Sequence, residues 1–394
     1  MEDIKRVKLS EIVELITKGT TPTTLGYEFQ DEGVNFLKIE CFDENGGFIE
    51  SKVAHISEEC HKKMKRSQLK NGDILFSIAG AIGRVAIVTE EMLPANINQA
   101  LAIIRISDEQ VYLPYIKLIL TSPIVIEQFE RKKQGVAQLN LSLKDINEIS
   151  IPLPSKDKQI ELAELFDKVV GVISKRNKEL SALDDLIKAR FVEMFGDPIQ
   201  NPKGWEVVTI GDIVTEVRYG TSKPAVEGGK YPYLRMNNLT ADGHLDLNDL
   251  KYIDIPDDEI EKCVVRKGDV LFNRTNSIEL VGKTAVFDLP EDMIIAGYII
   301  RVRLTEKMLP EVLSQYMNLE ALKGILRGMA KGAVNQANIN AQELQSIKVY
   351  IPEMELQKQF VKMKEQIYKS KVAVQKALDE TQMLFDSLMQ KYFA

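Results

Sequence analysis

The sequence repeats once over its whole length, and this duplication restricts the chain to two copies of one architecture. Residues 71–76 read NGDILF, and residues 267–272 read KGDVLF. The match continues to the ends of both halves, where Phe195 aligns with Phe393, so the offset is about half of the 394 residues. A period of about 200 residues is far longer than a solenoid repeat of roughly 20–45 residues. We therefore predict a tandem duplication of one domain.

Each half is predicted to form an α+β domain that leads into a long helix. Runs of β-branched and aromatic residues predict strands, and apolar residues at helical spacing predict the helices after them. The predicted strands are 73–78, 85–88, 270–272 and 284–287, and the predicted shorter helices are 113–133 and 309–327. Strands followed by helices are typical of the α+β class. We place the two globular domains at residues 1–150 and 198–349, and the helical segments at 151–197 and 350–394.

Heptad spacing of apolar residues predicts two long helices, at residues 156–195 and at about 353–393. Prolines precede the first helix, and Gly196 with Pro198 ends it. About 40 residues at about 1.5 Å each give a rod of roughly 60 Å, which suits a spacer. The residues expected to pair the helices are Phe166, Val169, Ile173, Leu180, Leu183 and Ile187 in the first, and Ile367, Val374, Leu378, Phe385 and Leu388 in the second.

The two apolar stripes complement each other better than either complements itself. The first helix has Arg176 where the second has Val374, and Phe166 where the second has Lys364. Since the first helix leads into the second domain and the second helix follows that domain, geometry favours an antiparallel coiled coil with pseudo-twofold symmetry. Two solvated linkers are the alternative, and stripes of this regularity argue against it.

Composition predicts a cytoplasmic protein with a core of ordinary size. Hydrophobic residues make up 44% of the chain and charged residues 28%. No run of 18 apolar residues occurs, and the N-terminus lacks the apolar core of a signal peptide, so we expect no membrane association. Cys41, Cys60 and Cys263 are odd in number and widely spaced, which favours reduced thiols.

The sequence contains no recognisable catalytic or metal-binding motif. Glycine spacings of the dinucleotide-binding and Walker A types are absent, and Gly80 and Gly83 are spaced differently. Cys60 and His61 are an isolated adjacent pair rather than a zinc pattern. The three histidines suggest no triad with a serine or cysteine nucleophile. We predict a protein that is not an enzyme and that holds neither metal nor cofactor.

Loops rich in glycine, hydroxyl, amide and cationic residues recur at equivalent places in both halves. We predict DNA contacts from these loops. The candidates are Lys18, Thr20, Thr21, Lys38, Ser77, Arg84, Lys132, Lys133 and Gln138 in the first half, and Arg218, Tyr219, Thr221, Lys223, Arg235, Asn237, Asn273, Arg274, Asn276, Lys331, Asn335 and Gln336 in the second.

The chemistry of these side chains suits double-stranded DNA. Arginine and lysine pair with guanine, asparagine and glutamine pair with adenine, and hydroxyl groups reach phosphates. The net charge of -7 argues against a uniformly basic surface, so the cations must be concentrated on these loops. Such loops can also be ordinary turns, but their recurrence in both halves favours the binding interpretation. Residues 273–277 differ wholly from 77–81, which predicts that the halves read different sequences.

The chain resembles the specificity subunits of type I restriction–modification systems over essentially its whole length. The resemblance rests on the duplicated plan, on FVEMFGDP at residues 191–198 followed by NPKGW at 201–205, and on the Gly-Asp-Ile/Val-Leu-Phe string in each half. It includes IPLPSKDKQ at residues 151–159 and YIPEMELQ at 350–357. Lys158 is one departure, because an acidic residue is common before this glutamine in the family.

This resemblance implies two target-recognition domains, each reading one half of a bipartite asymmetric DNA site. It implies that the paired helices set the unspecified spacer and dock two methyltransferase subunits, which supply S-adenosylmethionine binding and adenine methylation after base flipping. Restriction subunits would add ATP- and magnesium-dependent translocation and cleavage. None of that chemistry is expected in this chain.

Two other functions fit the sequence. One is the recognition subunit of a type IIB-like restriction enzyme, which shares the duplicated plan. The other is a coiled-coil scaffold that binds only proteins. An autonomous nuclease or methyltransferase is disfavoured by the absence of catalytic motifs.

Overall fold

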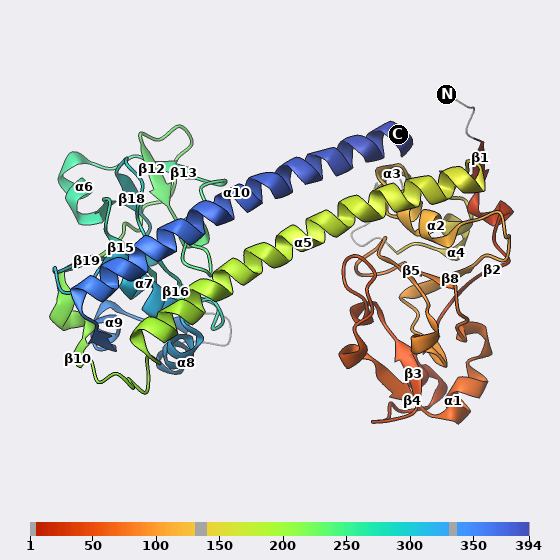
Figure 1. The fold of residues 1–394 in the computed structure, drawn as a ribbon, viewed down its shortest axis with the longest axis horizontal. Coiled ribbons are helices and arrows are strands. Elements are labelled where there is room, and N and C mark those ends of the chain that lie inside the picture. Colours follow the sequence, from red (N-terminus) through yellow and green to blue (C-terminus); the bar gives the residue numbers. More distant parts are fainter. Residues whose placement is uncertain (1–4, 131–139, 331–336, 394) are drawn as a thin grey trace. The chain divides into compact units, whose positions relative to one another are not determined.

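The computed structural model describes residues 5–130, 140–330 and 337–393. Internal contacts divide the chain into two units: unit 1 is Met1–Lys175 with Ala377–Ala394, and unit 2 is Arg176–Lys376. Each unit therefore contains one globular domain and a segment of each long helix (Figure 1). The duplicated α+β plan with two long helices is confirmed.

Unit 1 contains nine strands: β1 (Arg6–Lys8), β2 (Leu15–Lys18), β3 (Val34–Leu37), β4 (Ala54–Ile56), β5 (Ile74–Ser77), β6 (Val85–Ile87), β7 (Ala95–Ile97), β8 (Leu101–Arg105) and β9 (Ser150–Pro152), counted over its described residues. Its described α-helices are α1 (Glu58–Lys63), α2 (Leu113–Leu120), α3 (Pro123–Glu130), α4 (Leu143–Asn147), the first part of α5 (Lys156–Phe195) and the end of α10 (Met354–Phe393). Its 3-10 helices are Leu9–Glu11, Pro22–Leu25, Ile39–Cys41, Glu50–Lys52, Lys65–Ser67 and Glu90–Met92.

Unit 2 repeats this order with a few additions. Its strands are β10 (Glu206–Thr209), β11 (Val214–Tyr219), β12 (Tyr231–Leu234), β13 (Lys251–Ile253), β14 (Val264–Val265), β15 (Val270–Asn273), β16 (Thr275–Asn276), β17 (Thr284–Val286), β18 (Met293–Ile295), β19 (Ile299–Leu304), β20 (Ala337–Asn338) and β21 (Lys348–Ile351). Its described α-helices are the end of α5, then α6 (Asp257–Cys263), α7 (Pro310–Asn318), α8 (Glu320–Met329), α9 (Ala341–Gln345) and the first part of α10. Its 3-10 helices are Ile210–Ile213 and Met236–Asn238.

The sheets of the two units have matching strand orders. A four-stranded antiparallel sheet runs β2-β8-β5-β6 in unit 1 and β11-β19-β15-β17 in unit 2. A second sheet runs β4-β3-β7 in unit 1 and β13-β12-β18-β14 in unit 2, with one parallel pair in each. Small sheets β1-β9 and β10-β21 join the start of each domain to the strand before its long helix.

The repeated Gly-Asp string builds the turn that leads into the central strand of each four-stranded sheet. Its glycines have positive φ angles of 84° and 92°, which an L-residue adopts only with strain. The aspartates then bind an arginine from the neighbouring strand: Asp73 lies 2.7 Å from Arg105, and Asp269 lies 2.9 Å from Arg303. The repeat thus preserves a turn and a partly buried ion pair.

The shorter helices lie where helical periodicity predicted one or two helices after the strands. The described part of residues 113–133 contains α2 and α3, and residues 309–327 contain α7 and most of α8. The chain turns at Ser122, which is fully buried, and at Leu319, whose backbone is extended. Helical spacing of apolar residues continues across both breaks, so periodicity alone could not locate them.

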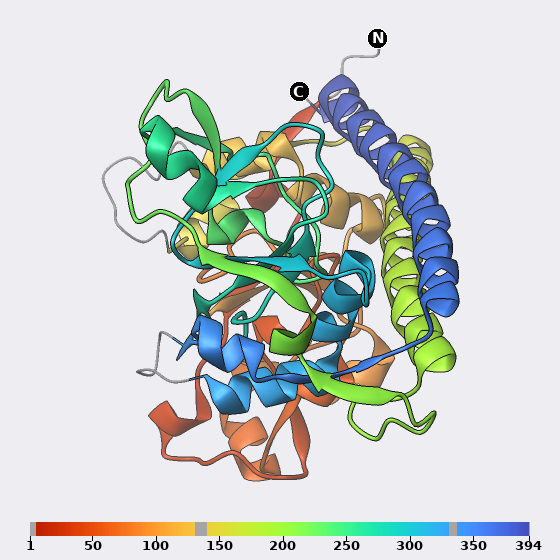
Figure 2. The ribbon, with the colours of Figure 1, turned by 90° about the vertical axis from the view of Figure 1, so that its left-hand side faces the viewer.

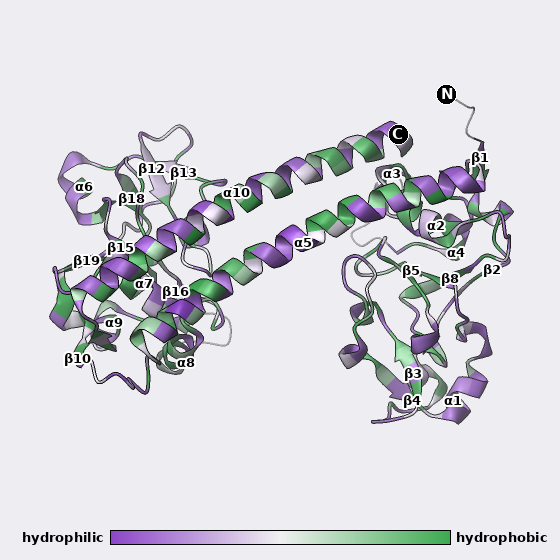
Figure 3. Cartoon of the chain, viewed as in Figure 1, coloured by the Kyte–Doolittle hydropathy of each residue, from purple (hydrophilic) through white to green (hydrophobic). Residues whose placement is uncertain are grey.

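The long helices pair antiparallel within each unit (Figure 1 and Figure 2). In unit 1, the early part of α5 packs on the end of α10, with ring centroids of Phe166 and Phe385 5.5 Å apart. In unit 2, the end of α5 packs on the start of α10, with centroids of Phe191 and Phe360 5.3 Å apart. Apolar and polar residues alternate along both helices in Figure 3.

The predicted helix-pairing residues all lie buried or partly buried. Phe166, Val169, Ile187, Ile367 and Val374 are buried, and Ile173, Leu180, Leu183, Leu378, Phe385 and Leu388 are partly buried. Phe166 belongs to the main core of unit 1, and Ile187 and Ile367 belong to the main core of unit 2.

One buried glutamine fixes the start of each long helix to its domain. Gln159 accepts a hydrogen bond from the backbone of Tyr112 at 2.8 Å and donates to the carbonyl of Pro154 at 2.9 Å. Gln357 makes the equivalent bonds to Leu309 and Pro352, both at 2.8 Å. These hydrogen bonds explain why the Pro-x-x-x-x-Gln pattern recurs in both halves. The residue before the glutamine differs between the halves, but the glutamine makes the same contacts.

Two further predictions concern cysteines and membranes. Cys41, Cys60 and Cys263 are buried free thiols. Within the described ranges, no helix is both long and apolar enough to cross a membrane.

Candidate nucleic-acid interface

Most of the predicted DNA-contacting loops gather at one end of the four-stranded sheet in each unit. In unit 1, Lys18 at the end of β2 pairs with Ala102, and Ser77 at the end of β5 pairs with Leu101. The loops 18–21, 77–84 and 97–100 therefore meet at this end. In unit 2, the loops 219–223, 273–277 and 296–299 meet in the same way. We call this end of each sheet the loop end.

A glycine brings two of these loops into close backbone contact. A Cβ atom on Gly19 would lie 2.0 Å from the carbonyl oxygen of Ile97, and one on Gly220 would lie 2.1 Å from that of Ile295. Any side chain here would therefore force the loops apart. This contact explains why Gly-Thr follows the first long strand in both halves.

In unit 2 the loop end is organised around Arg274. Its guanidinium lies 4.8 Å from the centre of the Tyr219 ring, which is a cation–π contact. The same group donates to the side chain of Asn338 at 3.2 Å and to the carbonyl of Gly297 at 3.4 Å. The Tyr219 hydroxyl accepts a hydrogen bond from the backbone of Ala341 at 2.8 Å. Arg274 therefore holds three segments together.

Two tyrosines project from this arrangement. Tyr219 is 42% exposed and Tyr298 is 50% exposed. The carbonyl of Tyr298 accepts from the backbone of Arg274 at 2.9 Å, so its backbone is fixed while its ring faces solvent. Asn276, partly buried, donates to Asn273 at 3.0 Å. The loop end of unit 2 therefore presents aromatic faces and amides on a rigid base.

Three candidate cations of unit 2 are already paired with carboxylates. Arg218 lies 3.0 Å from Glu216, Lys223 lies 2.8 Å from Glu259, and Arg235 lies 2.7 Å from Asp249. Thr221 accepts from the backbone of Lys223, and Asn237 is exposed. These ion pairs reduce the positive charge of the surface, in keeping with the net charge of -7.

Unit 1 presents a different set of side chains at its loop end. Lys18 and Thr20 are exposed, and Lys18 forms no ion pair among the described residues. Thr21 donates to the side chain of Gln99 across the two loops. Lys38 lies beside this group, 3.6 Å from Glu40 and 5.1 Å from the centre of the Phe29 ring.

Three candidates shape the loops from within. Ser77 is buried and donates to the carbonyl of Ala79, and Asn273 is buried and donates to carbonyls of Thr275 and Tyr298. Arg84 is partly buried and donates to the carbonyl of Phe42 at 3.1 Å.

The counterpart of Arg84 in unit 2 is Lys283. Lys283 precedes β17 as Arg84 precedes β6, and its ammonium donates to the carbonyl of Leu239 as Arg84 donates to that of Phe42. The cation at this position therefore ties the loop to the same turn in both units.

The other predicted candidates lie outside the described residues. They are Lys132, Lys133, Gln138, Lys331, Asn335 and Gln336.

Strand register identifies the equivalent positions of the two loop ends. Lys18 corresponds to Tyr219, because each is paired with the second residue of the next strand. Ala100 likewise corresponds to Tyr298, because each immediately precedes that strand. Ile78 corresponds to Arg274. Each follows the central strand of its sheet, and the carbonyl of each accepts a hydrogen bond from a backbone N–H just before a short helix, α4 in unit 1 and α9 in unit 2. The aromatic and cationic set therefore belongs to unit 2 alone.

Sequence reasoning did not select Tyr298 or Asn338. Tyr298 belongs to no motif, and only its register against β15 places it at the loop end. Asn338 lies in a string that recurs in both halves, and this recurrence was the available signal. This string also recurs for a structural reason, because Ser142 and Asn340 are the N-cap residues of helices α4 and α9.

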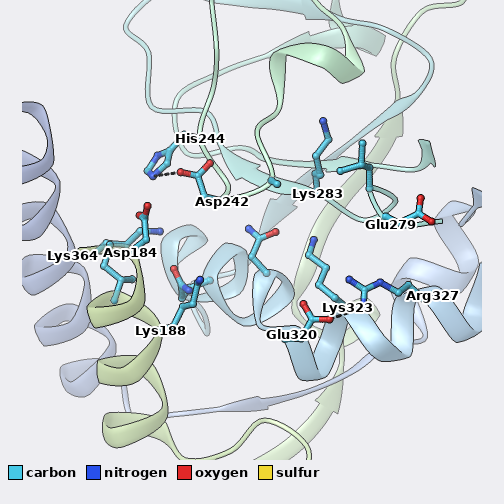
Figure 4. A pocket seen from close by; sticks show the side chains of 15 residues that line it. Asp184, Lys188, Asp242, His244, Glu279, Lys283, Glu320, Lys323, Arg327 and Lys364 are labelled. Atoms are coloured by element: carbon cyan, nitrogen blue, oxygen red, sulfur yellow. Dashed lines mark hydrogen bonds and ion pairs between the residues drawn. The ribbon is translucent and has the colours of Figure 1, made fainter. Parts of the chain in front are cut away.

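A cavity of about 300 Å³ lies elsewhere in unit 2, between the long helices, α7, α8 and residues 240–244 (Figure 4). Lysines and carboxylates line it, and His244 stacks on Tyr368 with ring centroids 5.2 Å apart. Among the described residues, no group of three or more histidine, cysteine or acidic side chains could hold a metal ion.

The chain belongs to the family described as "Type I restriction modification DNA specificity domain". The family matches residues 1–182 and 202–381, which together make up most of the chain. The two matches correspond to the two copies of the internal repeat.

Individual relatives agree with this family. The type I restriction enzyme EcoKI specificity subunit of Escherichia coli strain K12 is 21% identical, over 96% of this chain and 87% of the relative. A solved chain from work on complex assembly and conformational transition of the type I R-M system is 19% identical, covers 98% of this chain and 96% of its own, and has a TM-score of 0.60. The S subunit structure from M. genitalium is 15% identical, covers 100% and 97%, and has a TM-score of 0.54. At these identities the structural likeness concerns the fold.

Proposed function

We propose that this chain is the sequence-specific DNA-recognition subunit of a type I restriction–modification complex, in which each globular domain reads one half of a bipartite asymmetric site. One observation carries the proposal. The two loop ends share their backbone plan and the close glycine contact, yet present different side chains. A common scaffold with different contact groups is what recognition of two different half-sites requires.

In unit 2, we assign direct contacts to exposed groups and a positioning role to Arg274. Its guanidinium nitrogens Nη1 and Nη2 already bind Gly297 and Asn338, and its Nε is buried without a hydrogen-bond partner among the described residues. Tyr219 and Tyr298 offer ring faces for apolar contact with thymine methyl groups or stacking. Asn237 offers an exposed amide that suits adenine.

In unit 1, Lys18 is the exposed cation at the position of Tyr219. A lysine ammonium is positively charged and can donate to guanine O6 and N7 in the major groove, whereas a tyrosine offers only a neutral hydroxyl. Thr20 and Thr21 lie next to it and offer hydroxyl groups for phosphates. The two units are therefore expected to differ in base preference at this position.

The paired helices are proposed to set the distance between the half-sites and to dock two modification subunits. Gln159 and Gln357 support this role, because each fixes the start of a long helix to its own domain. The modification subunits would bind S-adenosylmethionine and methylate adenine, and restriction subunits would use ATP and magnesium. This chain would perform no catalysis itself. The relative that aligns over most of both chains is a type I specificity subunit, which favours type I over a type IIB-like arrangement.

Single-molecule sequencing of methylated DNA tests the proposal. The chain would be produced with its modification partners in a host that lacks other methylation, and we expect one bipartite, asymmetric methylated motif. Arg274→Met should relax or change only the half-site read by unit 2. Arg266→Met is the matched control, because Arg266 forms surface ion pairs with Glu261 and Asp292 away from the loop end.

Three outcomes would contradict the proposal. The first is methylation without sequence preference, the second is a single continuous motif, and the third is a change in both half-sites on Arg274→Met. Loss of methylation together with loss of complex assembly would instead indicate a folding defect, and Tyr298→Ala would then test the same half-site from an exposed position.

A further inference from the structure

In unit 2, one group of side chains ties the turn at residues 239–245 to both long helices. The ammonium of Lys371, on α10, lies 2.5 Å from the carboxylate of Asp184 on α5 and 3.6 Å from that of Asp242 in the turn. His244 in the same turn lies 3.7 Å from Asp242, and its ring packs on that of Tyr368 with centroids 5.2 Å apart. The side chain of Lys371 is only 13% exposed. We call these five residues the helix tie, and Figure 4 shows His244 and Asp242 next to each other.

The turn is the tip of a longer segment, residues 235–246, whose two ends are joined by hydrogen bonds. The side chain of Asn238 is buried, accepts from the backbone of Arg235 and donates to the carbonyl of Asp246, both at 2.8 Å. The backbone of Asp246 donates in turn to the carbonyl of Asn238 at 2.8 Å. A shift of the tip is therefore transmitted to the start of the segment.

The 235–246 segment starts at the loop end of unit 2. The carbonyl of Leu234, just before the segment, accepts from the backbone of Ala296 in one of the loops of the loop end at 2.9 Å. Arg235 and Asn237, two of the predicted DNA-contacting residues, follow directly, and Asn237 is exposed. The segment therefore connects a predicted contact surface with the long helices.

Other contacts of the segment support it from the side of the sheets. The Lys283 ammonium donates to the carbonyls of Met236 and Leu239. Leu239 also packs in an apolar cluster with the strands of both larger sheets. Among the described residues, neither this cluster nor the second cluster of the β13-β12-β18-β14 sheet includes a residue of α5 or α10. The helix tie therefore adds a second support, which comes from the helices.

Unit 1 has the same turn but lacks the tie. The β-bridge that closes the turn joins Phe42 to Phe48 in unit 1 and Leu239 to Leu245 in unit 2, so the two turns align residue for residue. The equivalents of the five tie residues are all uncharged, and they are Asn45, Gly47, Val170, Ile173 and Gln382. A cavity of about 620 Å³ is lined by Asn45 of this turn and by Val170 of α5. The shared scaffold therefore folds without a helix tie.

The tie depends on charge. Burial opposes ionisation of Asp242, but the hydrogen bond from Thr240 and the neighbouring His244 and Lys371 hold the pKa of its carboxyl below the ordinary value. Asp242 is therefore a carboxylate at neutral pH. Removal of Lys371 would leave the carboxylates of Asp184 and Asp242 without their shared cation, which breaks the contact from the side of the helix.

We propose that the helix tie positions the 235–246 segment for base recognition, so that helix α10 takes part in reading the half-site of unit 2. Lys371 and Tyr368 are positioning residues, which act through Arg235 and Asn237. The inference rests on the proposed function, and it gives the helix a role beyond spacing the half-sites. Unit 1 is expected to read its half-site without this support.

Hydrogen exchange measured by mass spectrometry on the full chain tests the support without DNA. Lys371→Ile, which introduces the residue of unit 1, should speed exchange of the hydrogen-bonded amides in residues 240–246 about tenfold, because a partly buried charged contact is lost. Lys371→Arg keeps the charge and should exchange like the wild type. Lys369→Met is the control, because Lys369 is exposed on the same helix.

Competition between DNA sites then tests recognition by the complex with its modification partners. Methylation of the full site is compared with methylation of sites in which one base pair of either half-site is changed. Lys371→Ile and Asp242→Asn should each lower the preference for the correct bases about tenfold in the half-site of unit 2, and leave the other half-site unchanged. The double variant should lose no more than either single variant, because both substitutions remove the same contact.

Three results would overturn the inference. The first is exchange in Lys371→Ile that equals the wild type, and the second is faster exchange with full base preference in both half-sites. The third is an equal loss of preference in both half-sites, which would indicate a general folding defect. A wild-type complex without a bipartite motif would refute the proposed function and with it the recognition role of the tie, whereas the exchange measurement does not depend on DNA.

Discussion

Lys323 provides a direct measure of uncompensated charge in unit 2. The substitution is Lys323→Met, which keeps the length and apolar stem of the side chain and removes the ammonium group. In the folded chain this group is 9% exposed, and burial lowers its pKa from 10.5 to about 8. The unfolded chain retains the ordinary value, so the two states bind protons differently over a defined pH range.

The sign and size of the pH dependence of stability follow from this difference in pKa. Between about pH 8 and 10.5 the unfolded state binds more protons than the folded state, so the lysine makes stability rise with pH. Each pKa unit corresponds to about 1.4 kcal/mol, which gives about 3 kcal/mol over the whole range. At pH 7 the charged lysine imposes this full cost, which is offset in part by its hydrogen bond to Gly282.

The assay is urea unfolding at several pH values from 7 to 10, followed by the fluorescence of Trp205, the single tryptophan, which lies in unit 2. Lys323→Met should be at least as stable as the wild type at pH 7. Its advantage should shrink by about 3 kcal/mol as the pH approaches 10.5, whereas Lys362→Met, which removes an exposed lysine of α10, should show no such trend. A stability difference independent of pH would refute the argument.

Three further predictions concern the helices and the loop ends. Phe191→Ala should destabilise unit 2 by about 3–5 kcal/mol and lower the midpoint reported by Trp205, because Phe191 packs on Phe195, Phe360 and Tyr316. Phe166→Ala is its counterpart in unit 1 and should leave that midpoint unchanged. Insertion of one heptad between Ile173 and Leu183 should change the spacer in the methylated motif while both half-sites stay the same; altered half-sites would contradict the spacer role. Gel shifts should show weak, steeply salt-dependent DNA binding by the isolated chain and tighter binding with modification partners. Equally tight binding without partners would count against that dependence.

The sequence predicted the helices and strands whose position is set by residues close together in the chain. The heptads between Lys156 and Phe195 fixed a helix whose observed bounds are the same, since flanking prolines and Gly196 limit it at both ends. The runs of residues 73–78 and 270–272 predicted strands, and β5 and β15 lie there. The break between α2 and α3 escaped prediction, because apolar spacing runs through Ser122 without interruption.

The candidate site was less accessible to prediction, because its chemistry depends on contacts between distant residues. Arg84 and Arg274 read as exposed cations in sequence, yet each is held by carbonyl or amide groups from segments far along the chain. Residue type could not reveal these partners. The lysines that line the unit 2 cavity are Lys188 of α5, Lys283 of a strand loop, Lys323 of α8 and Lys364 of α10, so no short sequence window contains more than one of them.

The duplication separates residues that hold the scaffold from residues that face a ligand. Gln159 and Gln357 make the same bonds in their units, as do the two aspartates of the Gly-Asp turns. By contrast, Lys18 has become Tyr219, and Phe166 has become Lys364, at positions where the backbone does not change. Substitution at the exposed position of Lys18 and Tyr219 is expected to change the contacts of the unit without disturbing its fold, whereas Phe166 is a buried core residue of unit 1. Exchanging Phe166 and Lys364 for each other's residue should therefore be tolerated best at Lys364, because Lys364→Phe removes a charge, whereas Phe166→Lys places one among Phe385, Tyr392 and Phe393.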